Sequence, residues 1–161
     1  LAPRIREVLR ENIENTNWRV RKFVIDALPA VTKALGEFDA SLLNKYLACF
    51  SDAIWDVRVA SAEVVVKLRD AWKIDWVFKN VLDWLEPKSL DARWCVRWAR
   101  VKAYEAALDG SMKGEVIAKS VAVIVRAIDS EKVPNIKILV GELLAVAAGV
   151  ADDGLVKDTI R

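Results

Sequence analysis

The sequence predicts an all-α fold in which antiparallel helix pairs stack into an α-α superhelix, and two observations lead to it. A short phrase, such as Asp52-Ala-Ile-Trp55-Asp-Val57-Arg58, occurs four times, and its aromatic or proline residue recurs after 37, 39 and 40 positions. Between the copies, apolar residues keep the three- and four-residue spacing of helices. An internal period of roughly 20 to 50 residues is typical of a solenoid. The four copies span residues 15–21, 52–58, 91–97 and 131–137.

We expect one continuous array, because no Ser-, Gly- or Pro-rich linker divides the 161 residues. Each helix pair carries an apolar stripe that only a stacked neighbour can bury, so the pairs should fold together. The chain begins without methionine and stops soon after a new helix would start, which we interpret as a fragment of a longer solenoid. The expected repeats are residues 1–36, 37–73, 74–110 and 111–149, with a partial fifth at 150–161.

The first pair is expected at residues 3–13 and 18–35. Pro3 suits a first helical turn, where its missing N–H has no partner in any case. The polar turn 15–17 can cap the second helix. Gly36 fits the end of that helix, and Pro29 within it should produce a kink.

The other pairs are expected from the same periodicity. Asp75 should cap the first helix of the third pair. The runs 64–66 and 121–125 are rich in valine and resemble strands in isolation, but they lie within long helical periods. The expected helices are residues 40–50 and 55–72, then 75–85 and 92–108, then 114–128 and 133–148.

In each phrase an acidic or amide residue precedes a basic residue by six positions. The acidic end lies at the turn, where it can cap the following helix and meet the positive end of its dipole. Residues six apart do not share a helix face, so we expect the basic residue to reach the acidic residue of an adjacent repeat. Such a structural ladder would fix the stacking register. Its members are Asn15 and Arg21, Asp52 and Arg58, Asp91 and Arg97, and Glu131 and Lys137.

An acidic residue, a proline or aromatic three positions later, and then Val-Arg, within a helical hairpin of this length, resembles the HEAT repeat. Among HEAT proteins, the chain is most similar to the scaffold (A) subunits of protein phosphatase 2A, through residues 20–36 and 50–62. In that family, the turns within repeats hold catalytic and regulatory subunits. The resemblance therefore implies a protein-binding scaffold with contact positions at Trp18, Arg19, Trp55, Asp56, Arg93, Trp94, Lys132 and Asn135.

The turn tryptophans allow two interpretations. Trp is a frequent hot spot in protein interfaces because it buries a large area and keeps a polar edge. Equally, each indole could wedge between the two helices of its own repeat. Trp98 lies four positions after Trp94 and should share its face.

The composition argues against an enzyme. The chain has no histidine, which removes Ser-His and Cys-His nucleophiles and the commonest zinc ligand. No glycine-rich phosphate loop is present. We expect no metal, no cofactor and no small-molecule substrate. Cys49 and Cys95 should be buried free thiols in a reducing compartment, either cytoplasmic or nuclear. The longest apolar stretch, residues 138–151, is too short for a membrane span.

Two alternatives remain open. The run Asn17-Trp18-Arg19-Val20-Arg21 is similar to the early turn of tubulin-binding TOG arrays. HEAT-like DNA glycosylases hold duplex on a basic surface, and Arg93, Arg97, Arg100 and Lys102 form the densest basic cluster here. The net charge of only +2 argues against nucleic acid as a partner.

Overall fold

The computed structural model describes residues 2–85, 93–108, 120–122, 125 and 131–150. All regular secondary structure in these ranges is helical, as the sequence predicts. The long helices are α1 (Ala2–Asn12), α2 (Trp18–Leu35), α3 (Ala40–Cys49), α4 (Trp55–Trp72), α7 (Trp94–Ala107) and α9 (Pro134–Val150).

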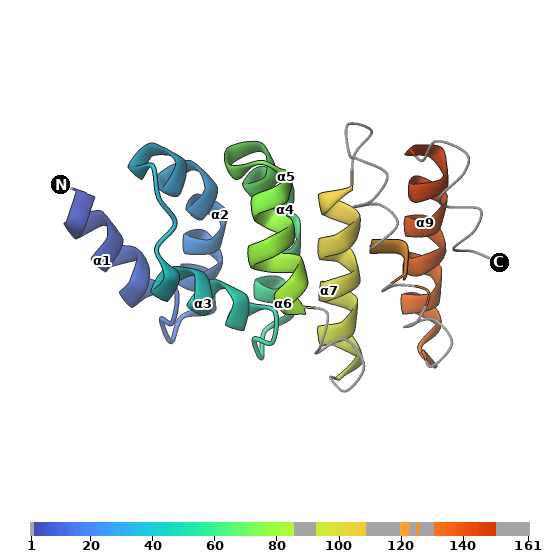
Figure 1. Cartoon of the computed structure of the whole chain (residues 1–161). Coiled ribbons are helices and arrows are strands. Elements are labelled where there is room, and N and C mark those ends of the chain that lie inside the picture. Colours follow the sequence, from blue (N-terminus) through green and yellow to red (C-terminus); the bar gives the residue numbers. More distant parts are fainter. Residues whose placement is uncertain (1, 86–92, 109–119, 123–124, 126–130, 151–161) are drawn as a thin grey trace.

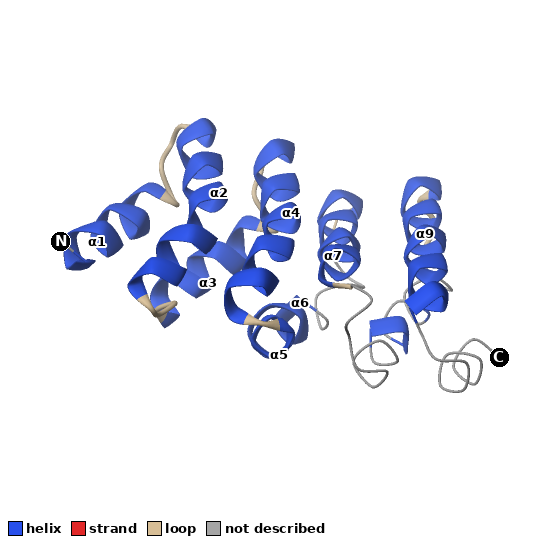
Figure 2. Ribbon diagram, turned by 90° about the horizontal axis from the view of Figure 1, so that it is seen from above, coloured by secondary structure: helices blue, strands red, loops and turns tan. Residues whose placement is uncertain are grey.

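The helices that follow the four phrases form a row in chain order. Helix α2 packs against α4, α4 against α7, and α7 against α9 (Figure 1). Helix α3 and the short segment from α5 to α6 lie to one side of this row (Figure 2). The repeated phrase therefore marks the start of each helix in the row.

The helices of the first two pairs have nearly the expected bounds. The capping residues at the two ends of α2 illustrate the reason. The Asn17 side chain caps α2 by accepting from the Arg19 N–H at 3.0 Å. Gly36 ends α2 in the left-handed conformation, with φ of 70°, which costs glycine little. Helix α2 continues through Pro29, and the Thr32 hydroxyl in the next turn donates to the Leu28 carbonyl at 2.6 Å.

The third pair differs from its prediction. Its first helix begins at Ile74, directly after Lys73, whose φ is 66° and ψ is 161°. The expected cap at Asp75 is wrong, because this residue lies inside the first turn and α5 (Ile74–Val77) has no side-chain cap. The helix then widens into a π-turn, η1 (Phe78–Leu82), before α6 (Asp83–Leu85). The second helix of this pair, α7, begins at Trp94, slightly later than expected.

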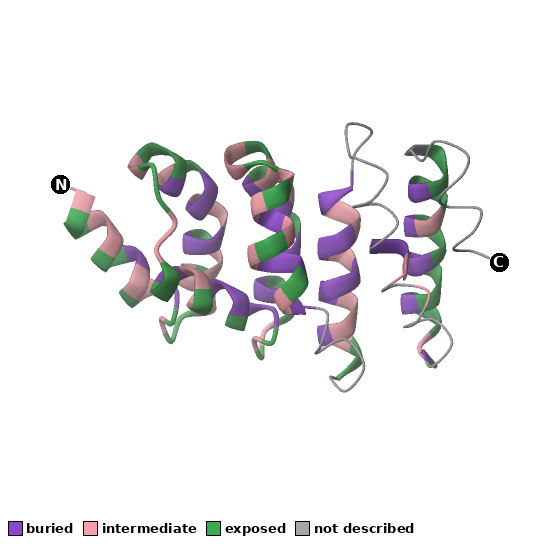
Figure 3. Cartoon of the chain, viewed as in Figure 1, coloured by how far each residue is buried: buried purple, intermediate pink, exposed green. Residues whose placement is uncertain are grey.

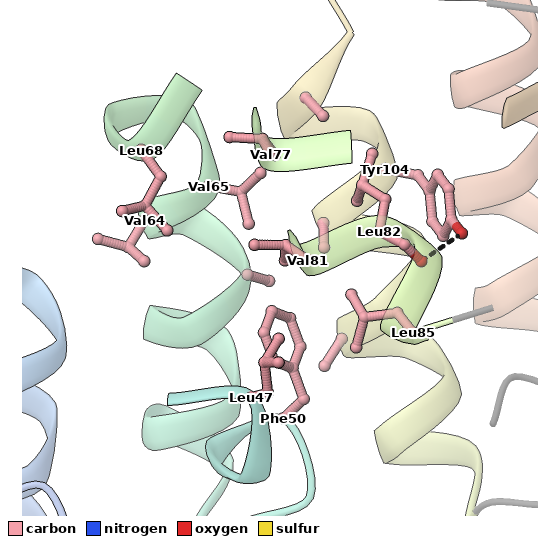
Figure 4. Close-up of a cluster of buried hydrophobic side chains, with 14 of the residues drawn as sticks. Leu47, Phe50, Val64, Val65, Leu68, Val77, Val81, Leu82, Leu85 and Tyr104 are labelled. Atoms are coloured by element: carbon pink, nitrogen blue, oxygen red, sulfur yellow. Dashed lines mark hydrogen bonds between the residues drawn. The ribbon is translucent and has the colours of Figure 1, made fainter. Parts of the chain in front are cut away.

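Buried residues line the sides on which neighbouring helices meet (Figure 3). Side chains from α3, α4, the α5–α6 segment and α7 gather into one cluster (Figure 4). Two buried tyrosines satisfy their hydroxyls within it, since Tyr46 donates to the Ser61 carbonyl at 2.7 Å and Tyr104 to the Leu82 carbonyl at 3.0 Å. This matters because an unpaired buried hydroxyl is costly.

Aromatic side chains fill the junction between the ends of α2 and α4. The Phe38 ring stacks on Trp76 with centroids 5.3 Å apart, and Trp72 lies 5.5 Å from Trp76. The Trp72 indole N–H donates to the Thr32 hydroxyl at 3.1 Å. These tryptophans thus join adjacent helix pairs.

Part of the expected organisation falls outside the described residues. This applies to Asp91, to most of the first helix of the fourth pair, and to the partial repeat at 150–161 apart from the last residue of α9. Ser120, Val121, Ala122 and Val125 are helical, in a run that resembles a strand by composition. Within the described ranges, no helix has both the length and the apolar character needed to cross a membrane.

Candidate functional site

The turns that precede α2, α4, α7 and α9 lie along one edge of the row, which we call the turn edge (Figure 1). It comprises residues 13–17, 50–54, 93 and 131–133, together with the first residues of each following helix. Most of the expected ladder and contact residues lie on it.

Arg21 joins the first turn to the second. Its Nε and Nη2 atoms donate to the two carboxylate oxygens of Asp52, at 2.8 Å each. Its Nη1 atom donates to the carbonyl of Asn15 in its own turn, at 2.7 Å. Both charged side chains are mostly buried, with exposures of 15% and 12%. One guanidinium therefore holds two consecutive turns at a fixed distance.

Arg58 repeats part of this arrangement one step along the row. Its Nη1 atom donates to the carbonyl of Asp52, as Arg21 does to Asn15. Arg58 is buried, and its guanidinium also lies 5.4 Å from the centroid of the Trp55 ring. Its expected partner in the next turn, Asp91, is outside the described residues.

Arg97 and Glu131 link the last two helices of the row. The Arg97 Nε and Nη2 atoms donate to the Glu131 carboxylate at 2.7 and 2.9 Å. The hydrogen bond from Arg97 holds the pKa of Glu131 below its ordinary value, against the opposing effect of burial. The Glu131 carboxylate also accepts from the N–H groups of Lys132 and Val133, at 2.9 Å each. The remaining ladder cation, Lys137, is exposed.

The acidic residues act at the turns differently from the expectation. The Asp52 carboxylate accepts from the Ile54 N–H at 2.8 Å, which folds the turn, but α4 has no side-chain cap. The prediction that Asp52 caps its helix is therefore wrong. The hydrogen bonds from Arg21 and Arg58 to carbonyls six residues earlier could not be predicted from the sequence. Every residue carries a backbone carbonyl, so residue type does not show which carbonyl accepts.

Three indoles come together across the junction of α4 and α7. The Trp55 ring lies 4.5 Å from Trp98 and 6.1 Å from Trp94, centroid to centroid. Trp98 is half-buried against the core, whereas Trp55 and Trp94 are 38% and 47% exposed. The Trp55 ring plane is tilted by 44° to that of Trp98 and by 38° to that of Trp94, so the indoles contact one another between repeats without stacking. Neither sequence interpretation included this arrangement. We call Trp55, Trp94 and Trp98 the indole cluster.

The other expected contact residues are spread along the same edge. Trp18 is half-buried against the core, and the Arg19 guanidinium lies 4.7 Å from the centroid of its ring. The remainder are exposed: Arg19, Asp56, Arg93, Lys132 and Asn135.

The expected basic cluster does not form one exposed face. Arg93 is exposed, but Arg97 is committed to Glu131 and Arg100 is only 3% exposed. Burial lowers the pKa of Arg100 to about 10, and its Nε and Nη1 atoms have no hydrogen-bond partner among the described residues. Lys102 pairs with Glu105. This arrangement gives little cationic surface for a nucleic acid backbone.

Hollows on the described part of the chain include the following pair. One of about 310 Å³ adjoins Arg21 and Asp52, and includes Glu14, Lys45 and Cys49. The other, of about 420 Å³, lies between α4 and α7 beside Glu63, Arg69 and Lys102. No group of three or more potential metal-ligating side chains occurs in the described part of the chain.

The two thiols have different environments. Burial raises the pKa of the Cys49 thiol to about 12, and its Sγ atom donates to the Lys45 carbonyl at 3.3 Å. Cys95 is half-buried, which differs from the expectation that both would be buried.

Comparison with known proteins adds no family assignment. No protein-family model matches the chain, and no curated protein matches it.

Proposed function

We propose that the chain is a protein-binding scaffold, a HEAT-like solenoid that presents its turn edge to another protein. The indole cluster is the observation that carries this proposal. Two neighbouring indoles, each more than a third exposed, lie on the edge where consecutive turns meet. Exposed tryptophans fixed by neighbours lose little side-chain entropy on binding, so they contribute strongly to interfaces.

The ladder supports the same function. Arg21 and Arg97 fix the spacing between turns through nearly buried carboxylates. A partner that contacts several turns at once then meets a preformed surface, which lowers the ordering cost of binding. The resemblance to phosphatase scaffolds makes the catalytic and regulatory subunits of a protein phosphatase 2A the first partners to test.

The test uses purified phosphatase subunits and calorimetry or surface plasmon resonance. The wild-type chain should bind, and the double variant Trp55→Ala, Trp94→Ala should lose at least about tenfold in affinity while keeping its helical circular dichroism. Asn44→Asp, an exposed change on α3, serves as the matched control and should bind as the wild type. A wild-type chain that binds no subunit, or a double variant that binds equally well, would contradict the proposal. Purified tubulin in the same assay tests the TOG-like alternative.

A further inference from the structure

We propose that the junction of α4 and α7 binds an extended segment of a partner protein, which carries an apolar ring and, about four positions away, a basic side chain. This inference rests on the proposed function, because it names the chemistry of the segment that covers the indole cluster. It depends on the charges around the hollow of about 420 Å³ between the same two helices.

The indole cluster and this hollow lie on one face of the junction. Residues three and four positions apart share a helix face. In α4 this spacing leads from Trp55 through the half-buried Val59 to Glu63, which is exposed and lines the hollow. In α7 it leads from Trp98 to Lys102, which lines the hollow from the other helix. We call the surface formed by these five residues the junction face.

Among the described residues that line the hollow, Glu63 carries a charge without a counterion. Lys102 is paired with Glu105, with 2.5 Å between the ammonium nitrogen and a carboxylate oxygen. Arg69 lies 3.4 Å from the Asp70 carboxylate and donates to carbonyls at the end of α7. Glu63 makes no ion pair with any residue that the structure describes. A basic side chain of a partner therefore meets a carboxylate that no other cation holds.

The indole end of the junction face favours an apolar ring over a second cation. The guanidinium of the buried Arg58 already lies 5.4 Å from the centroid of the Trp55 ring, and the exposed Arg93 directly precedes Trp94. Another cation here would be repelled at short range. The 47% exposed Trp94 offers an indole surface on which a further ring can pack. The apolar end and the basic end of a bound segment thus have different places.

The width of the junction favours an extended segment. Two packed helices have axes about 8–10 Å apart, whereas a further helix with its side chains is itself about 10–12 Å wide. An extended chain is narrower, advances about 3.3 Å per residue and turns alternate side chains to the same side. Trp55 and Glu63 are about 12 Å apart along their helix, which corresponds to about four extended residues. The ring and the basic side chain should therefore be at positions i and i+4.

The probes are short labelled peptides with one phenylalanine and one arginine in a serine–threonine background. Fluorescence anisotropy measures their binding to the full chain. With the two residues at i and i+4, in one or the other order, binding should be at least about fivefold tighter than at i and i+1, or at i and i+7, the spacing of a helix face. Replacing the arginine by glutamate should weaken this peptide by at least about fivefold.

Glu63→Lys should reverse the preference, so that the glutamate peptide binds more tightly than the arginine peptide. Glu63→Gln should weaken the arginine peptide by at least about threefold. The matched control is Glu11→Gln on α1, which should bind every peptide as the wild type does. Both glutamates are exposed, so the circular dichroism of each variant should remain that of the folded chain.

The double variant Trp55→Ala, Trp94→Ala distinguishes failure of this inference from failure of the proposed function. If it loses the phosphatase subunits while Glu63→Lys leaves the charge preference unchanged, the scaffold proposal stands and the inference is wrong. A wild-type chain that binds the subunits but no peptide, or binds the i and i+7 peptide best, would overturn the inference in the same way. A double variant that binds both subunits and peptides like the wild type would contradict both proposals.

Discussion

Arg21 holds both carboxylate oxygens of Asp52, a residue 31 positions further along the chain, with nitrogen–oxygen distances of 2.8 Å. The same guanidinium donates to the Asn15 carbonyl. A planar side chain with several fixed donors can make these bonds at once, whereas a lysine ammonium cannot match the carboxylate with two parallel bonds. The relationship predicts that this pair stabilises the junction of α2 and α4.

Asp52→Asn should lower the free energy of unfolding by about 1–3 kcal/mol, because it removes the charge that Arg21 faces in a nearly buried site. Urea unfolding followed by circular dichroism measures the change. The control is Asp26→Asn, which breaks the half-exposed pair of Asp26 with Lys22 and should change stability by less than about 0.5 kcal/mol. Equal effects of the two substitutions would show that the junction pair has no special role.

Stability should fall in acid partly through Glu131. The hydrogen bond from Arg97 keeps its pKa in the folded chain below the ordinary value of 4.5, so the unfolded chain binds the proton more readily. This contribution is complete above about pH 4.5 and is lost as the pH falls through the lower folded-state pKa. Urea unfolding between pH 6 and pH 3 should show a shallower decline in Glu131→Gln than in the wild type. A parallel decline in both would contradict this account.

Much of this fold could be predicted from the sequence, because the start and end of a helix depend on the residues at those positions. The bounds of α2 follow from Asn17 and Gly36, because caps depend on the residue itself. The Lys73 conformation and the π-turn at η1 could not be predicted, since they depend on how α5 packs after α4. Likewise, the cross-repeat Trp55–Trp98 contact depends on the distance between helices, which residue types do not fix.

Lys73→Gly should stabilise the chain by about 1 kcal/mol. Lys73 has φ of 66° and ψ of 161°, a region that is costly for residues with a Cβ, and its side chain is exposed. Thermal unfolding is a suitable measurement. Gly36→Ala is the opposite control, because it places a Cβ at φ of 70° and should cost about 1 kcal/mol. A loss of stability in Lys73→Gly would mean that the lysine makes a contact outweighing its strain.

Cys49 should resist thiol reagents in the folded chain. Burial raises its pKa to about 12, so little thiolate exists near neutral pH, and its side chain is only 6% exposed. In Cys95→Ser, a chromogenic disulfide should react with the remaining thiol only as fast as the chain opens, and rapidly in urea. Rapid reaction without denaturant would show that α3 opens on its own.

Within the indole cluster, the indole that stabilises the fold should differ from the indoles that bind a partner. Trp98 packs against the core, so Trp98→Ala should cost about 2 kcal/mol or more in unfolding free energy. Trp94 is 47% exposed, so Trp94→Ala should cost less than about 1 kcal/mol. Urea denaturation of both variants gives the comparison. A larger cost for Trp94→Ala would favour a structural role for this indole and weaken its assignment to partner binding.

The wide turn at η1 has a consequence for the length of a repeat. Each π-type hydrogen bond encloses one residue more than its α counterpart, so a helix can take in an inserted residue without a longer loop. The segment from Trp55 to Trp94 contains this turn and is two residues longer than that from Trp18 to Trp55, by the spacings of 39 and 37. An added residue can thus be taken up inside a helix away from the turn edge, so that each arginine keeps its place three residues after the tryptophan that begins its own helix.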